Sequence, residues 1–344
     1  MEQLSAARPH PNPLPEGEGG NHPRRAAAGV TPSPLCGEGW GRSGAFEPHA
    51  ASPRSDSGLQ AGGRTASEGR AATELDQGFK QRLVKLSTGA QQAVREAGSG
   101  TPIVLLHGMG SGAASWLRCA MALESHSRVI AWDAPGYGAS TPLSQTTPLA
   151  TDYAQRLGDL MTALNIDRCT LVGHSLGALM AAAFAHGAGG ARVQRLVLLS
   201  PACGYGAPGR EAGRQVMLAK RLDDLHTLGI DGLAARSAER MLTPAASDAT
   251  RAWLRWNTAR LNPAGYTQAV QMLCGDDITR YAPLAMPVEV HCGDGDIVTP
   301  PQACRDVAAT FAAPFTLIEH AGHACAIEQP GAVAALIARA ADLP

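Results

Sequence analysis

The chain has 344 residues, of which 29 are Lys or Arg and 30 are Asp or Glu, so its formal net charge is −1. This length suits one large α/β domain with an insertion, or two domains. Because no run of basic residues stands out, we expect neither nucleic acid nor an anionic membrane surface as a partner.

The N-terminal segment, residues 1–78, differs in composition from the rest of the chain. It holds 9 Pro and 13 Gly but few aliphatic residues, so it could bury little apolar surface to offset the entropy of ordering. We expect residues 1–78 to be disordered, with a Pro-rich binding tail as the alternative. Residues 11–19 resemble residues 32–39, which favours an upstream start-site error over a domain, although no Met occurs between Met1 and Met109.

The eight cysteines are scattered along the chain and form no C-x-x-C pair, and the N-terminus shows no apolar signal core. Isolated cysteines of this kind are typical of free thiols in a reducing compartment. Together these two observations predict a cytoplasmic location.

From about residue 80 the pattern changes to short apolar runs separated by amphipathic stretches. Apolar and polar residues alternate in residues 82–88 and 91–96, which predicts a β-hairpin. Apolar positions in residues 151–164 recur at helical spacing. Four continuous apolar runs predict strands buried on both faces: residues 103–106, 129–132, 169–172 and 196–199. Alternating strands and helices predict an α/β fold with a mostly parallel sheet and right-handed crossovers.

The strand rhythm stops after Pro201 and resumes with predicted strands at 288–292 and 315–318. The stretch between them shows helical patches and no strand pattern: residues 219–228, 233–241 and 250–261. We therefore expect residues 79–202 and 284–344 to form the two parts of one core. Residues 203–283 would be a helical cap over the C-terminal edge of the strands, where open α/β sheets place their sites.

Residues 171–177 read Leu-Val-Gly-His-Ser-Leu-Gly, the G-x-S-x-G arrangement of a strand, a sharp turn and a helix. The turn leaves little room for side chains two residues before and after Ser175, and Gly173 and Gly177 occupy those positions. We predict that Ser175 is an exposed nucleophile at the positive end of a helix.

A serine nucleophile needs a base and an acid that orients the base, and on this kind of fold the acid precedes the His. Asp294 and Asp296 both lie in the loop after the predicted strand 288–292. We predict that Asp296 is the acid, because it follows the turn glycine Gly293 by three residues. Asp294 would shape the turn.

His320 and His323 are the candidates for the base, because both follow the predicted strand 315–318. His323 comes directly after Gly322, whose missing side chain leaves room for a ring that faces the substrate. His320 lies closer to the strand end, so we expect a loop or surface role for it. We predict His323 as the base.

Two backbone N–H groups are predicted to bind the oxyanion that forms during acyl transfer. One belongs to Leu176, directly after the nucleophile, and the other to Met109 in the glycine-rich loop 107–112. We expect His107 to hydrogen-bond this loop, and His174 to pack in the turn beside the nucleophile.

Taken together, these motifs resemble the α/β-hydrolase superfamily over residues 80–344. The resemblance rests on Leu-His-Gly-Met-Gly (106–110), Asp-Ala-Pro-Gly-Tyr-Gly-Ala-Ser (133–140), Gly-His-Ser-Leu-Gly (173–177), Gly-Asp-Gly-Asp (293–296), Gly-His (322–323) and Glu-Gln-Pro (328–330). It implies the α/β-hydrolase fold with a cap domain, a Ser-His-Asp triad, and no metal or organic cofactor. Residues 296–301 are also similar to 3-oxoadipate enol-lactonases and their esterase relatives, but the His-Gly-Met-Gly loop departs from the Asn-Ser-Leu-Gly of those lactonases.

The function that this resemblance implies is hydrolysis of a carboxylic ester of a small molecule through an acyl-enzyme. An enol-lactonase or a carbon–carbon bond hydrolase of aromatic degradation is one alternative, and a non-catalytic small-molecule binding protein on the same fold is another. In the cap, Arg221, Arg240 or Arg260 could bind a substrate carboxylate, although single arginines on helices are more often solvated.

Overall fold

The computed structural model describes residues 73, 75 and 77–343. The predictions for residues 1–72 therefore lie outside the described residues. Residues 73, 75, 77 and 78 are helical, and the side chain of Leu75 is buried in the core beside Phe79. The core thus includes a residue from the end of the segment that was expected to be disordered.

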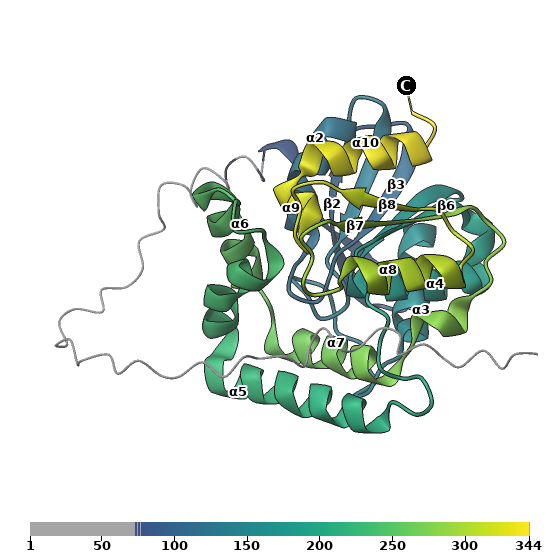
Figure 1. Cartoon of the computed structure of the whole chain (residues 1–344). Coiled ribbons are helices and arrows are strands. Elements are labelled where there is room, and N and C mark those ends of the chain that lie inside the picture. Colours follow the sequence, from purple (N-terminus) through teal and green to yellow (C-terminus); the bar gives the residue numbers. More distant parts are fainter. Residues whose placement is uncertain (1–72, 74, 76, 344) are drawn as a thin grey trace, which may run out of the picture. The chain divides into compact units, whose positions relative to one another are not determined.

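Eight strands form one sheet in the order β1-β2-β4-β3-β5-β6-β7-β8 (Figure 1). The strands are β1 Lys80–Lys85, β2 Gln91–Ala97, β3 Thr101–Leu106, β4 Ser127–Trp132, β5 Cys169–His174, β6 Val193–Leu199, β7 Val288–Gly293 and β8 Phe315–Ile318. Strand β2 pairs antiparallel with β1 and β4, and all other pairs are parallel. The predicted hairpin and mostly parallel sheet are confirmed.

Helices cover both faces of this sheet, which explains why its central strands are apolar throughout. One face carries α2 (Leu117–Leu123) and α10 (Pro330–Ala340). The other carries α3 (Ala150–Ala163), α4 (Leu176–His186) and α8 (Pro301–Thr310) (Figure 1). Shorter helices are η2 Ala113–Trp116, η3 Ala188–Arg192, η4 Ile278–Tyr281 and α9 Cys325–Glu328.

The predicted amphipathic helix over residues 151–164 is α3, and the positions that its spacing placed on one face are buried: Tyr153, Leu157, Leu160 and Met161. Helix α4 differs, because every residue from Leu176 to Ala185 is buried. It packs against the sheet, α3, η3 and η4, and a helix that is enclosed in this way is apolar all round.

Between β6 and β7 the chain forms α5 (Glu211–Met241), α6 (Asp248–Thr258) and α7 (Pro263–Gly275). The two helical patches predicted at 219–228 and 233–241 belong to α5, which is broken at Gly229 with φ 61° and ψ −175°. Side chains cap the next two helices, because Ser247 accepts a hydrogen bond from the Thr250 N–H and Asn262 from the Ala264 N–H.

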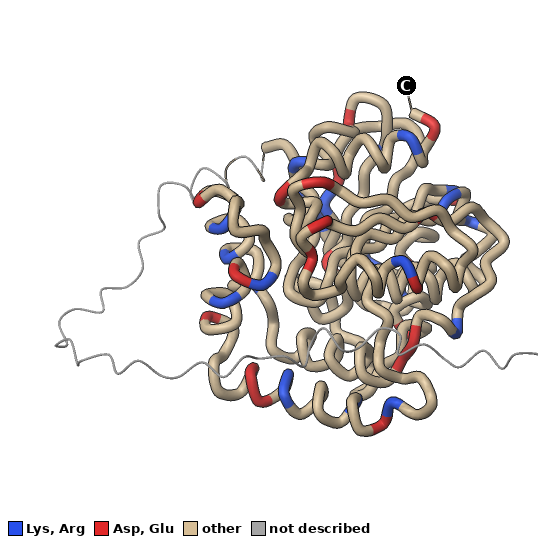
Figure 2. The backbone as a smooth tube through the Cα atoms, viewed as in Figure 1, with Lys and Arg blue, Asp and Glu red and all other residues tan. Residues whose placement is uncertain are grey.

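Basic and acidic residues are interspersed along the described elements (Figure 2). Among residues 73, 75 and 77–343, no helix combines the length and the apolar character needed to cross a membrane.

Six cysteines of the described part are free and buried: Cys119, Cys169, Cys274, Cys292, Cys304 and Cys325. Cys203 is disulfide-bonded, so the prediction of free thiols is wrong for this residue. Cys36 lies outside the described residues.

Candidate active site

Ser175 lies at the tip of the turn between β5 and α4, with φ 53° and ψ −116°. This backbone conformation is strained for a residue that has a side chain. Three backbone hydrogen bonds hold it: the Ser175 N–H donates to Leu199 O at 2.9 Å, and Ser175 O accepts from the N–H groups of Ala178 and Ala202. The nucleophile position is therefore fixed by the sheet and by the helix that follows.

Gly173 and Gly177 are glycines for a steric reason. A Cβ atom on Gly173 would lie 2.5 Å from the carbonyl oxygen of Gly177, and one on Gly177 would lie 2.4 Å from the carbonyl oxygen of Leu106. Both obstacles are backbone atoms, which cannot rotate away. The predicted requirement for side-chain-free residues on either side of Ser175 is confirmed.

We expect Gly177→Ala to lower the free energy of unfolding by about 3 kcal/mol or more, because the new methyl group must displace the β3 backbone. Urea or guanidinium unfolding measures the change. The control is Gly331→Ala in α10, where a Cβ would have nothing within 4 Å, so a change below about 1 kcal/mol is expected. Equal stability of the two variants would contradict the steric argument.

Asp296 and His323 are in direct contact, with 2.9 Å between the carboxylate Oδ2 and the ring Nδ1. Both side chains are buried. The other carboxylate oxygen accepts hydrogen bonds from the backbone N–H groups of Val298 (2.8 Å) and Thr299 (2.9 Å). The Thr299 hydroxyl donates to Asp296 Oδ2 at 2.9 Å. Four hydrogen bonds thus hold the carboxylate, which can orient the imidazole.

The ionisation of Asp296 follows from these contacts. Burial alone would raise the pKa of Asp296, but the neighbouring His323 and the hydrogen bonds from His323 and the Thr299 N–H lower it below its ordinary value. Asp296 is therefore a carboxylate across the neutral pH range, so it accepts the hydrogen bond from the Nδ1–H of His323.

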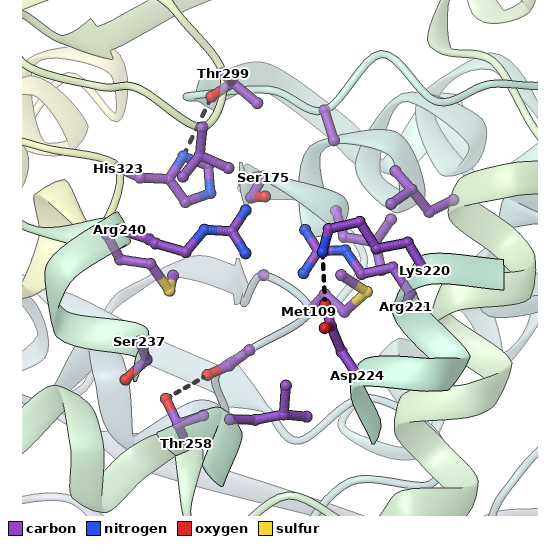
Figure 3. Close-up of a pocket in the computed structure, with 18 of the residues that line it drawn as sticks. Met109, Ser175, Lys220, Arg221, Asp224, Ser237, Arg240, Thr258, Thr299 and His323 are labelled. Atoms are coloured by element: carbon purple, nitrogen blue, oxygen red, sulfur yellow. Dashed lines mark hydrogen bonds and ion pairs between the residues drawn. The ribbon is translucent and has the colours of Figure 1, made fainter. Parts of the chain in front are cut away.

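Ser175, His323, Met109 and Leu176 all line one pocket with a volume of about 500 Å³. Figure 3 shows the hydroxyl of Ser175 and the ring of His323 at the same end of this pocket. Asp296 lies behind the ring, bonded to its Nδ1. The structure thus brings together all five residues that the sequence predicted for the site.

The two rival candidates lie apart from this arrangement. Asp294 is exposed, and its carboxylate accepts a hydrogen bond from the Ala321 N–H at 3.1 Å, which shapes the loop. His320 is also exposed, with φ 57° at the end of β8. Neither residue lines the pocket of Ser175.

The two residues that carry the predicted oxyanion donors line the same pocket. Leu176 is the first residue of α4, where helix N–H groups have no intrahelical acceptor. The carbonyl of Met109 accepts a hydrogen bond from the Tyr137 hydroxyl at 2.8 Å, which orients the loop. Within residues 77–343 we find no hydrogen-bond acceptor for the N–H of Met109 or of Leu176.

His107 pins the loop that carries Met109. Its Nε2 accepts a hydrogen bond from the Ala134 N–H at 2.9 Å, and its Nδ1–H donates to Gly108 O at 2.8 Å. This pattern requires a neutral ring, and burial lowers the pKa of His107 accordingly. The structural role predicted for His107 is confirmed.

His174 does more than pack beside the nucleophile. Its Nε2–H donates to the backbone carbonyl of His323 at 2.7 Å, and the two rings lie 4.9 Å apart. Burial, followed by the nearby His323, lowers the pKa of His174 to about 3. A neutral His174 therefore holds the backbone of the predicted base in place.

Sequence reasoning assigned no role to Glu328, although it belongs to the Glu-Gln-Pro motif. Its carboxylate accepts hydrogen bonds from the N–H of Gly322 at 2.7 Å and from the N–H and hydroxyl of Thr243. It therefore ties the loop of His323 to Thr243, two residues after the end of α5. The motif was the available signal, but its partner lies 85 residues away in the chain.

Acid is expected to destabilise the protein because buried histidines must stay neutral in the folded state. An unfolded His has a pKa near 6.5, whereas burial lowers the pKa of His174 to about 3 and that of His291 to about 4. At pH values between the folded and the unfolded pKa of each histidine, the unfolded chain binds a proton that the folded chain does not. Stability therefore falls with falling pH, by about 1.4 kcal/mol per pH unit for each such histidine.

The test is His174→Gln, which keeps an N–H donor but cannot titrate. Urea unfolding between pH 4 and 6 is expected to show a shallower loss of stability than in the native protein. His320→Gln removes an exposed histidine and should leave the slope unchanged. If His174→Gln and the native protein lose stability in parallel, His174 does not contribute to the pH dependence of stability.

A model of the alpha/beta hydrolase family matches residues 103–336, and the chain belongs to this family. Members of the family act on esters, lactones and carbon–carbon bonds. The 2-hydroxy-6-oxo-2,4-heptadienoate hydrolase of Pseudomonas putida is 36% identical over 121 residues, which are 33% of this chain and 42% of that protein. The chain spans 28% of the length of three uncharacterized mycobacterial relatives.

Solved structures show the same fold. The enol-lactonase from Burkholderia xenovorans LB400 aligns with a TM-score of 0.66 and 23% identity, covering 75% of this chain and 98% of that one. A thermophilic esterase from Thermogutta terrifontis aligns with a TM-score of 0.66 and 23% identity, covering 75% of this chain and 97% of that one. The protein is thus an alpha/beta hydrolase with esterase, enol-lactonase and carbon–carbon hydrolase relatives.

Proposed function

We propose that this protein is a serine hydrolase that cleaves a carboxylic ester of a small molecule through an acyl-enzyme. The observation that carries the proposal is the meeting of Ser175, in its strained turn, with His323 in one pocket, where Asp296 orients the imidazole. A hydrolase fold needs neither the strained serine nor the buried Asp–His pair for stability, whereas acyl transfer uses both.

The proposed reaction begins when His323 Nε2 takes the proton of Ser175 as its oxygen attacks the ester carbonyl. Asp296 holds the imidazole in the required tautomer and stabilises its protonated form. The N–H groups of Met109 and Leu176 receive the oxyanion, and the loss of one such donor typically costs about 10²–10³ in rate. His323 then gives its proton to the leaving alcohol, and water repeats the sequence on the acyl-enzyme.

The helical segment 203–283 is proposed to act as a cap over this site. Residues of α5, α6 and α7 line the pocket together with Ser175, so the cap helices shape the space that a substrate would occupy. A small-molecule substrate agrees with a pocket of about 500 Å³. The cytoplasmic location, the absence of a cofactor, and the absence of nucleic-acid or membrane partners stay predictions.

The relatives support a second candidate reaction on the same residues. The enol-lactonase of Burkholderia xenovorans and the heptadienoate hydrolase of Pseudomonas putida are named for a lactone and a dienoate. Hydrolysis of an enol-lactone or of a ring-cleavage dienone is therefore the alternative to ester hydrolysis. A non-catalytic binding protein is the third candidate.

One experiment separates the three candidates. The purified protein is assayed side by side on short aryl esters, an enol-lactone and a ring-cleavage dienone, and is also treated with a fluorophosphonate probe. We expect ester turnover and a covalent adduct at Ser175. Turnover of the lactone or dienone alone would favour the second candidate, and neither turnover nor labelling would favour the binding protein.

A further inference from the structure

The pocket beside Ser175 is unusually rich in charged side chains. Four basic residues and three acidic residues line it: Lys220, Arg221, Arg236, Arg240, Asp224, Glu239 and Asp306. Lys220 forms an ion pair with Asp224 at 3.5 Å. The lining as a whole therefore carries a positive excess, before the neighbouring His323 is protonated in the reaction.

Arg221 and Arg240 come from the same helix but face each other across the pocket. In a straight helix, 19 residues would separate them by about 28 Å. The break at Gly229 in α5 prevents this separation, because its φ of 61° and ψ of −175° belong to a region that only glycine adopts readily. Figure 3 shows the two guanidinium groups pointing toward each other close to Ser175.

This arrangement places two like charges where they repel. Arg221 is buried. Burial first, and then the positive charge of Arg221, lower the pKa of Arg240, while the negative charge of Asp224 acts in the opposite direction. An anion bound between the two groups would be attracted by both and would remove their mutual repulsion. The planar guanidinium fork matches the two oxygens of a carboxylate, which makes a carboxylate the best-fitting anion.

We propose that Arg221 and Arg240 bind a carboxylate of the substrate other than the group that Ser175 attacks. The substrate class is therefore a carboxylate-bearing ester or lactone, such as a monoester of a dicarboxylic acid. This inference rests on the proposed hydrolase function for its catalytic part. The binding part stands on the facing guanidinium groups alone.

The activity test compares monomethyl esters of succinic, glutaric and adipic acid with the matching dimethyl esters, which have the same chain without the charge. Methanol release gives kcat/KM. We expect the native protein to prefer at least one monoester over its diester. Arg240→Met should lower kcat/KM for that monoester by about 10–100-fold, the effect of losing a charge-assisted hydrogen bond. Its effect on the diester should stay within about threefold.

Arg221→Met should behave in the same way, but Arg221 is buried, so this variant could fold poorly. Arg221→Lys keeps the charge but loses the planar guanidinium fork, and it should show an intermediate loss of kcat/KM for the monoester.

The matched control is Arg260→Met. Arg260 lies on the loop after α6 with its guanidinium over the Trp256 ring, 4.6 Å from the ring centroid, and does not line the pocket. The Arg260→Met variant should leave the preference for the monoester unchanged.

A binding measurement separates this inference from the proposed function. Calorimetry follows binding of the three monomethyl esters and of the matching dimethyl esters to the Ser175→Ala protein, with and without Arg240→Met. If a monoester binds more tightly than its diester and Arg240→Met abolishes this difference, the carboxylate site is supported even if no ester is hydrolysed. Equal affinity for the monoester and the diester in every pair would overturn the inference, and so would a monoester preference that survives Arg240→Met.

Discussion

Ser175→Ala is expected to lower kcat for the best ester substrate by about 10⁴–10⁶-fold. The alanine cannot form the acyl-enzyme, so only the oxyanion donors and substrate binding are left to accelerate the reaction with water. The free energy of unfolding should change little, because alanine fits the backbone of the turn as well as serine does. Steady-state kinetics and urea unfolding measure the two quantities.

The control for this variant is Ser237→Ala. Ser237 lines the same pocket from α5, and its hydroxyl donates to the Ala234 carbonyl at 2.7 Å. Removing that hydroxyl should change kcat by less than about tenfold. Turnover and fluorophosphonate labelling that persist in Ser175→Ala would remove Ser175 from the mechanism.

Asp296→Asn is expected to lower kcat by about 10⁴-fold at neutral pH. The carboxylate accepts hydrogen bonds from His323, Val298 and Thr299, and an amide in its place would present an N–H to some of these donors. The imidazole would then lose both its fixed tautomer and the negative charge that stabilises its protonated form. Steady-state kinetics on the best ester measures the loss.

Asp294→Asn is the matched control, because it makes the same chemical change two residues away. Asp294 is exposed, and its carboxylate accepts a hydrogen bond from the loop backbone at Ala321. Its substitution should alter kcat by less than about tenfold. A larger loss in Asp294→Asn than in Asp296→Asn would reverse the assignment of the acid.

Much of the fold and of the site could be predicted because the signals are local. The strand β5, the sharp turn and the helix α4 are encoded in consecutive residues, and the two glycines beside Ser175 follow from steric demands within that turn. The prediction of Asp296 and His323 also depends on local signals. Each follows a strand whose C-terminal end lies at the same edge of the sheet, so their meeting follows from the topology.

The features that sequence analysis did not predict depend on contacts between distant segments. The spacing of apolar residues predicts two helical patches in α5 but not the direction in which Gly229 turns the second one. Three arginines of the cap were therefore equal candidates, although Arg221 and Arg240 line the pocket and Arg260 does not. Likewise, nothing near Glu328 in the chain identifies Thr243 as its partner.

The position of Glu328 has a consequence for how α5 and the loop of His323 can move. One carboxylate holds both the loop that carries His323 and Thr243, two residues after the end of α5, and the Ala324 N–H adds a hydrogen bond to Met241 O at 2.8 Å. An outward swing of α5 would strain these bonds and drag the imidazole away from the nucleophile. Any movement of α5 relative to the loop of His323 would therefore act on the position of the imidazole.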